Sequence, residues 1–310
     1  MAGRNVSRTV KTSWKRDLKM NRNIYLLFLP ILIYFLIFNY LPMFGVVMAF
    51  QDFKAIKGFF GSQFVGFQNF ISFFSSPDFW TVLRNTLVIS FLGLGVGFPL
   101  QIIFALLLNE IYYTRFKKLV QTFSYLPHFV SAVVICGLII EFVSSNGLIT
   151  NLLVMLGFPR ENLLQNPKYF WGINLLTDVW QGLGYGSIIF MAAITGVSQE
   201  LHEAATIDGA NRLKRVWHVT IPAIVPTIVT MLVLRIGMIL NVGFEKILLL
   251  YNPSIYETAD VISTHVARMG IERMQYGYSA AVGLFNSVVA TMLLVISNYL
   301  SKKLAQTSVF

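Results

Sequence analysis

The sequence is poor in charge, cysteine and histidine, and each shortage narrows what the chain can be. Asp, Glu, Lys and Arg make up 12% of its 310 residues, whereas soluble domains carry about 25%. The single cysteine, Cys136, lies in an apolar run and cannot form a disulfide within the chain. The four histidines are scattered without metal-ligand spacing. We therefore expect neither a large soluble core nor a metal site, and no set of catalytic residues is indicated.

The sequence also lacks a phosphate-binding loop of the form Gly-x-x-x-x-Gly-Lys-Ser/Thr. Two glycine-rich stretches, 93–97 and 182–186, resemble nucleotide loops only superficially, because both lie inside apolar runs with no strand before them. Small residues at these positions are typical of close helix packing in membranes. The chain is therefore not expected to hydrolyse ATP itself or to bind a cofactor.

Hydrophobic residues, by contrast, are abundant and arranged in blocks. They make up 55% of the chain, and phenylalanine alone contributes 27 residues. Runs of about 20 apolar residues predict helices that cross a bilayer. The sequence therefore predicts an all-α, polytopic membrane protein with six transmembrane helices, at residues 24–50, 85–108, 119–143, 170–197, 221–243 and 277–300.

The basic residues predict the orientation of these spans. The net charge of +10 could suggest nucleic acid as a partner, but seven basic residues precede the first span, as in a cytoplasmic flank. With both termini inside, the inner segments hold fifteen basic residues and the outer segments hold eight. Both termini and residues 200–220 are therefore predicted to be cytoplasmic, with no role in nucleic-acid binding. The tail itself fits either an amphipathic helix on the inner leaflet or a solvated segment.

One polar segment, residues 203–222, separates the fourth and fifth predicted spans. Glu203, Ala204 and Ala205 favour a helix, and Gly209 can adopt the left-handed conformation that ends one. Pro222 suits the first turn of the following helix, where its missing N–H costs nothing. The pattern predicts a helix, a turn and a second helix outside the membrane. A surface connection between two spans would satisfy these observations as well.

The same segment resembles the signature loop of the permease subunits of binding-protein-dependent ABC importers. The resemblance rests on Glu-Ala-Ala, a glycine four residues after the second alanine, and the ending Val219-Thr220-Ile221-Pro222, where the family usually has Ile-x-Leu-Pro. Asp208-Gly209-Ala210 is similar to the carbohydrate-uptake, maltose-permease-like branch. In that family the loop is a coupling helix that docks in a groove of a separate ATPase. The resemblance implies that coupling involves Glu203, Ala204, Ala205, Asp208, Gly209, Ala210 and Pro222.

The resemblance also implies a fold, an activity and partners. It implies the fold of a type I ABC importer permease, a transporter subunit rather than an enzyme, in a bacterial cell membrane. The implied partners are a second permease subunit in a heterodimer, two copies of an ATPase that carry ATP and Mg, and an extracellular solute-binding lipoprotein. Residues 243–246 and 251–253 are similar to a subgroup that takes up oligosaccharides or polysaccharide fragments. The implied substrate is therefore a sugar or oligosaccharide.

Charged residues within the spans suggest where a substrate could pass. Asp178 and Arg235 each lie about eight residues, or roughly 12 Å, from the outer end of their span. At matching depth they could form a structural pair that fixes two helices, or share one polar cavity on the substrate path. Sugar sites combine aromatic faces with amide or carboxyl groups. The candidates for the path are Asp178, Trp180, Gln181, Tyr185, Arg235, Asn241 and Glu245.

These predictions divide the chain into four parts. They are a basic tail at 1–22, a first span with an outer loop at 23–84, a five-helix core at 85–300 that contains the coupling loop 200–222, and a tail at 301–310. A secondary active carrier for sugars or small solutes is the alternative function. It would favour an inverted repeat and a relay of intramembrane acids, and the sequence shows no convincing repeat and few such acids. A membrane enzyme fits less well, because no catalytic set of residues stands out.

Overall fold

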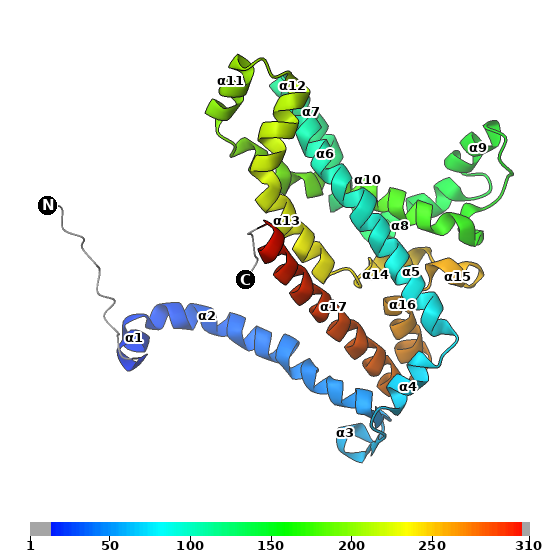
Figure 1. Cartoon of the computed structure of the whole chain (residues 1–310). Coiled ribbons are helices and arrows are strands. Elements are labelled where there is room, and N and C mark those ends of the chain that lie inside the picture. The colour runs from blue at the N-terminus through cyan, green and yellow to red at the C-terminus, as the bar shows by residue number, and fades with distance from the viewer. Residues whose placement is uncertain (1–13, 306–310) are drawn as a thin grey trace.

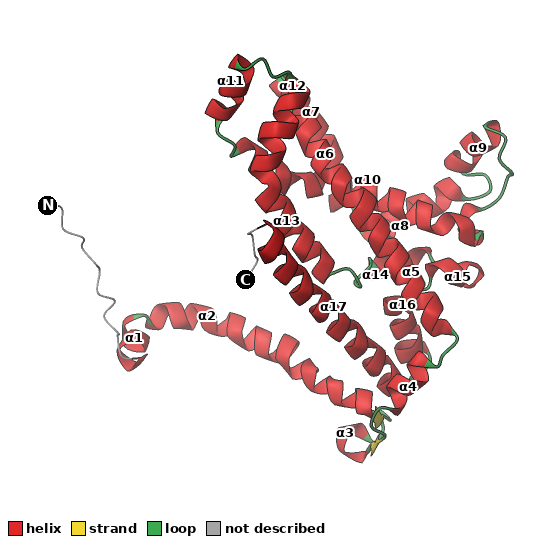
Figure 2. Ribbon diagram, in the orientation of Figure 1, coloured by secondary structure: helices red, strands yellow, loops and turns green. Residues whose placement is uncertain are grey.

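The structure is a computed structural model that describes residues 14–305, and helices make up nearly all of it (Figure 2). The predicted tails at 1–22 and 301–310 therefore lie partly outside the described residues. The one sheet among residues 14–305 is a two-residue antiparallel ribbon, in which β1 (Gln51–Asp52) pairs with β2 (Gln63–Phe64). Five of the described helices are long and apolar enough to cross a membrane. The all-α polytopic fold is confirmed.

The N-terminal helices form an arm that projects from the rest of the molecule (Figure 1). A short α1 (Trp14–Met20) precedes α2 (Arg22–Phe35), which continues through the π-helical turn η1 (Leu36–Tyr40) into the 3-10 helix η2 (Leu41–Phe50). Pro42 lies at the start of η2, where its ring disturbs regular α-helical hydrogen bonding. None of the most apolar 18-residue window of 22–50 is buried. The arm matches the first predicted span; no residue of α2 or η1 is buried, whereas η2 packs against the last helix of the chain.

The second predicted span is longer than expected. The helix α5 (Asp78–Leu92) continues through a π-helical segment η3 (Gly93–Gly97) into α6 (Phe98–Asn109). Together they run for 32 residues and start seven residues before the predicted span. The glycine-rich stretch 93–97 is thus a wide turn inside a membrane helix, followed by Pro99 in the first turn of α6.

The prediction of a single helix over 119–143 is wrong. Residues 114–125 form α7 (Thr114–Tyr125), a 3-10 turn η4 (Leu126–Phe129) follows, and α8 (Ala132–Val143) starts anew. Pro127 cannot donate a backbone hydrogen bond, and Ser131 caps the new helix by accepting from the N–H of Val134 at 3.4 Å. The membrane-length stretch here is 132–155, in which α8 is followed by α9 (Leu148–Met155).

The fourth predicted span is confirmed as a continuous helix, α10 (Pro167–Thr195), preceded by the 3-10 turn η5 (Leu163–Gln165). The side chain of Asn166 caps it by accepting from the N–H of Lys168 at 3.2 Å. Its 29 residues include Asp178 and Gln181, and it is not among the five helices that are apolar enough to be recognised as spans. It lies at the centre of the molecule, in contact with α6, α7 and α13 (Figure 1).

Residues 199–220 form the predicted helix, turn and helix at one end of the bundle. They comprise α11 (Gln199–Ile207), α12 (Arg212–Arg215) and the π-helical turn η6 (Val216–Thr220), which runs into α13 (Ile221–Gly237). The predicted fifth span, 221–243, is too long, because the helix ends at Gly237. The chain then turns through residues 238–243, with Gly243 in the left-handed region at φ 39°, and starts α14 (Phe244–Leu250).

Short helices form the two segments that the sequence predicted as outer loops, one after the first span and one before the last. In the N-terminal half they are α3 (Gly58–Gly61) and α4 (Gln68–Phe74). In the C-terminal half they are η7 (Pro253–Ile255), α15 (Tyr256–Ala259), α16 (Ile262–Ala267) and η8 (Arg268–Glu272). The last helix, α17 (Tyr276–Ala305), packs against α13 and η2 and confirms the sixth predicted span.

Candidate functional site

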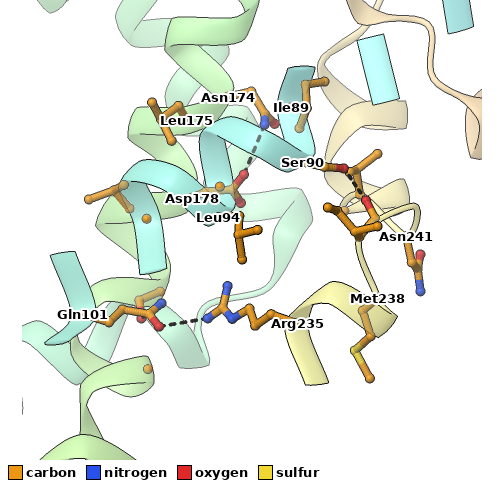
Figure 3. A pocket seen from close by; sticks show the side chains of 18 of the residues that line it. Ile89, Ser90, Leu94, Gln101, Asn174, Leu175, Asp178, Arg235, Met238 and Asn241 are labelled. Carbon is orange, nitrogen blue, oxygen red and sulfur yellow. Dashed lines mark hydrogen bonds between the residues drawn. The ribbon is translucent and has the colours of Figure 1, made fainter. Parts of the chain in front are cut away.

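A cavity of about 550 Å³ lies where α10 and α13 face the α5–η3–α6 helix. Its walls are largely apolar, but polar and charged side chains enter it from α6, α10 and α13 (Figure 3). Residues from the turn η4 and the segment 238–243 also line it. A mostly apolar hollow with a few convergent polar groups is the usual form of a small-molecule site.

Asp178 enters the cavity from α10, but it does not pair with Arg235 as the sequence allowed. Its carboxylate forms an ion pair with Lys246 of α14, and its Oδ2 accepts from Asn174 Nδ2 at 3.1 Å. The Lys246 side chain is only 8% exposed, whereas that of Asp178 is 47% exposed. The early end of α13 makes this pairing possible, because the chain turns back and α14 brings Lys246 against α10. Asp178 therefore faces the cavity, and the positive charge of the buried Lys246 compensates its negative charge.

Arg235 enters the same cavity from α13 and is held by Gln101 of α6. Its Nη2 donates to Gln101 Oε1 at 2.8 Å, and its guanidinium lies 5.9 Å from the centre of the Phe98 ring. Gln101 in turn donates to the carbonyl of Gly182 at 3.3 Å. A Cβ at Gly186 would come within 2.3 Å of Gln101. The second glycine-rich stretch is thus a packing surface for Gln101, as the sequence predicted.

An aromatic pair contributes a flat wall. The rings of His128 and Tyr185 stack at a centroid distance of 3.8 Å with an angle of 4° between them, and both residues line the cavity. Ser90 also lines the cavity, and its Oγ donates to the carbonyl of Ile239, which the end of α13 has released from helical bonding. Flat rings beside hydroxyl, amide and charged groups are features that suit a sugar.

Four of the seven path candidates line this cavity: Asp178, Tyr185, Arg235 and Asn241. Trp180, Gln181 and Glu245 do not line it. On α10 the spacing 178, 182 and 185 keeps one helix face toward the cavity, and residues two or three positions after Asp178 point elsewhere. Glu245 is exposed at the start of α14.

Sequence reasoning missed several lining residues and the lysine that pairs with Asp178. Gln101 stood out as an amide within an apolar span, and Asn174 lies one helical turn before Asp178, so both carried a usable signal. His128 carried no usable signal, because it is one of four histidines scattered along the sequence without metal-ligand spacing. Lys246 carried no such signal, because its role depends on the break after Gly237.

The predicted coupling segment is well formed and exposed. Gly209 adopts φ 77°, and the N–H of Ala210 returns to the carbonyl of Ala205 at 2.9 Å, which closes the end of α11. Arg215 donates to Thr206 Oγ1 at 2.8 Å and ties α12 to α11. Glu203, Ala204, Asp208 and Gly209 are exposed, Ala205 and Ala210 are half-buried, and Pro222 lies in the first turn of α13.

A second polar cluster stabilises the outer segment. Arg268 binds both oxygens of Asp260, at 3.0 and 2.5 Å, and Thr264 donates to the same carboxylate at 2.8 Å. Burial alone would raise the pKa of Asp260, but its bonds with His265, Arg268 and Thr264 outweigh burial and lower it. Burial would lower the pKa of Arg268, and the Asp260 carboxylate outweighs this and raises it. Asn85 of α5 donates to the Asp260 carbonyl at 2.9 Å, so the cluster anchors α16 to the long second helix.

No group of three or more His, Cys, Asp or Glu side chains within residues 14–305 could hold a metal ion. The two features that bear on function are the cavity and the exposed segment at 199–220.

The chain is similar to known membrane transport proteins. The family model described as "binding-protein-dependent transport system inner membrane component" matches residues 97–306. Protein LplB of Bacillus subtilis (strain 168) is 44% identical over 299 residues, which cover 96% of this chain and 94% of LplB. The polygalacturonan/rhamnogalacturonan transport system permease protein YteP of the same organism is 43% identical over 288 residues, covering 93% of this chain and 90% of YteP.

A solved structure is similar over nearly the whole chain. It is a bacterial alginate ABC transporter in complex with an alginate pentasaccharide-bound periplasmic protein, with a TM-score of 0.88 and 42% identity. The match covers 96% of this chain and 99% of that one. The chain therefore belongs to the family of binding-protein-dependent transport system inner membrane components, which are multi-pass permease subunits of ABC transporters and not enzymes.

Proposed function

We propose that this chain is the permease subunit of an ATP-driven importer of oligosaccharides or polysaccharide fragments. The observation that carries the proposal is the cavity at the junction of α6, α10 and α13, which combines a stacked aromatic wall with amide and charged groups. Relatives named as permeases for polygalacturonan or arabino-oligosaccharides support the sugar class. The substrate would pass along Asp178, Tyr185, Arg235 and Asn241, while Trp180, Gln181 and Glu245 would act outside this cavity.

The coupling element is the segment 203–222, with Glu203, Ala204, Ala205, Asp208, Gly209, Ala210 and Pro222. Leu201 and Ile207 on α11 are 53% and 86% exposed and offer an apolar surface for an ATPase. Residues 212–237 form one membrane-length helix whose far end carries Arg235. At 1.5 Å per residue this helix carries a displacement of α12 over about 35 Å to the cavity. ATP-driven movement of the partner would thereby reach the substrate path.

The family to which the chain belongs supports the proposed partners. A second permease subunit forms a heterodimer and covers the exposed arm at 22–50, two copies of an ATPase bind ATP and Mg, and a solute-binding lipoprotein delivers the sugar from outside. This chain binds no cofactor of its own. Residues 23–84 supply the first span and outer loop, and 85–300 supply the core. Both termini, including the tails at 1–22 and 301–310, are cytoplasmic in the bacterial cell membrane.

The test is reconstitution of the complete complex in proteoliposomes, with ATP inside and the binding protein outside. We expect the loaded binding protein to stimulate ATP hydrolysis and labelled oligosaccharide to accumulate inside. Uptake that needs a proton or sodium gradient, and no ATP, would show a secondary carrier instead and refute the proposal.

A further inference from the structure

The charges at the cavity are not balanced. Asp178 and Arg235 are the charged residues among its described lining residues. The charge of Asp178 is already compensated by Lys246, which is buried behind it. Within residues 14–305, no carboxylate lies within 4.0 Å of Arg235. The cavity therefore holds one positive charge without an anionic partner.

Arg235 is nevertheless held in a defined position. A guanidinium has five N–H donors, and one hydrogen bond, from Nη2 to the neutral amide of Gln101, holds it. Gln101 is held by its bond to the carbonyl of Gly182, and it packs in the space that a side chain at position 186 would fill. The Nε and Nη1 donors of Arg235 have no acceptor among the described residues. The side chain is exposed in the cavity and points inward from the end of α13 (Figure 3).

We propose that Arg235 binds the carboxylate of an acidic sugar unit, which makes the cavity a site for uronate-containing oligosaccharides. This inference rests on the proposed function and specifies its substrate class. A guanidinium fits a carboxylate through two parallel hydrogen bonds along one of its edges. Nη2 uses one N–H for Gln101, so its second N–H, together with the neighbouring Nε or Nη1, leaves one such edge available. The sugar ring would lie in the same cavity as the stacked Tyr185 and His128.

A purely structural role explains the arrangement less well. If the Gln101 contact served only to join α6 to α13, two neutral side chains would do so without placing a charge at membrane depth, which is costly. A bound carboxylate gives that charge a partner and accounts for the free donors.

The experiment compares acidic and neutral sugars in the reconstituted complex. The probes are two uronate trimers of different linkage, galacturonate and mannuronate, each paired with the same trimer after its carboxylates are reduced to alcohols. ATP-dependent uptake is measured for the wild type, Arg235→Gln, Arg235→Lys and the control Arg273→Gln. The control removes one exposed positive charge from the outer segment, away from the cavity.

We expect the wild type to take up at least one uronate trimer in preference to its reduced form. Arg235→Gln should lower that acidic-to-neutral ratio about tenfold or more, since hydrogen bonds to charged groups are among the stronger ones. Arg235→Lys should give an intermediate ratio, because lysine keeps the positive charge but cannot form two parallel hydrogen bonds to a carboxylate. Arg273→Gln should keep the wild-type ratio. Because the binding protein is the same throughout, a change in ratio between variants belongs to the permease.

ATP-dependent uptake with no wild-type preference, or with equal ratios in the wild type and both Arg235 variants, would overturn the inference and leave the proposed function standing. If the complex with Arg235→Gln does not assemble, the acidic-to-neutral uptake ratio of Arg235→Lys, compared with that of the wild type, tests the inference instead. ATP-dependent uptake of no trimer at all would overturn both proposals.

Discussion

At the scale of single residues, the ion pair at the cavity is asymmetric. Lys246 is buried at 8% exposure of its side chain, whereas the Asp178 side chain is 47% exposed. The two residues therefore differ in their access to water if the partner is removed. Lysine left alone stays away from water, whereas aspartate left alone can still be solvated from the cavity.

This asymmetry predicts that Asp178→Asn destabilises the protein more than Lys246→Met does. Breaking a fully buried pair costs about 3–5 kcal/mol, and we expect the loss for Asp178→Asn to approach the lower end of that range. The double variant should recover part of the loss, because no unpaired charge remains. Thermal unfolding of the detergent-solubilised chain, followed by size-exclusion chromatography, measures the effect. Equal and additive losses for the two single variants would contradict the pairing.

A second prediction at this scale concerns Asp260 and pH. Its pKa is lowered from 3.8 in the folded state by its bonds with His265, Arg268 and Thr264, against the opposing effect of burial. The charged carboxylate therefore contributes stability that is complete above the unfolded pKa and is lost as the pH falls through the lower, folded pKa. Melting temperatures from pH 3 to pH 7 should fall on the acid side in the wild type. Asp260→Asn should already be less stable at pH 7, by about 3 kcal/mol, and lose that part of the acid dependence. An unchanged acid dependence in the variant would show that another group is responsible.

At the scale of helices, glycines in α10 set how closely its neighbours approach. A Cβ at Gly184 would come within 2.2 Å of the carbonyl oxygen of Ser124 on α7, whereas a Cβ at Gly172 would meet nothing within 4 Å. The backbone of α7 cannot give way as a flexible side chain can. Gly184 is thus required by packing, and Gly172 is not.

We therefore expect Gly184→Ala to cost about 1–3 kcal/mol of stability, as overpacking does. Gly172→Ala serves as the control, and it should be neutral or slightly stabilising, since alanine favours a helix by up to about 1 kcal/mol relative to glycine. Both variants are compared by thermal unfolding. Equal stabilities would mean that α7 and α10 are farther apart than the structure shows.

The sequence predicted helices better than it predicted their interruptions. Long apolar runs located the first, second, fifth and sixth predicted spans, since hydrophobic length is a local property. Pro127 lay inside a run of suitable length, and the break after it depends on Ser131 capping a new helix. The end of α13 at Gly237 depends on contacts from distant segments, such as Ser90 with the carbonyl of Ile239. Lys246 could not be placed without that break, whereas Arg235 and Asp178 were found because charge within a span is rare.

At the scale of the whole molecule, the cavity and the segment 199–220 are linked by a single helix. Residues 212–237 are continuous, and Arg215 ties their start to Thr206 of α11. Figure 1 shows α11 and α12 at one extremity of the bundle, away from α4 and the base of the arm. Such an exposed end is suited to receive a partner and to pass its movement along α13.

The last prediction separates partner binding from the integrity of the bundle. Ile207 on α11 is 86% exposed and Ile271 in η8 is 76% exposed, so replacing either by glutamate should leave the fold intact. Ile207→Glu should abolish co-purification of the ATPase, because a charge would be buried in an apolar contact without a partner. Ile271→Glu, on the segment that precedes α17, should retain the ATPase. Affinity purification of the whole complex measures both, and chromatographic profiles of each variant confirm that the permease remains folded. Retention of the ATPase by Ile207→Glu would show that this surface of α11 is not its docking site, and the assignment of 203–222 as the coupling element would then have to be withdrawn.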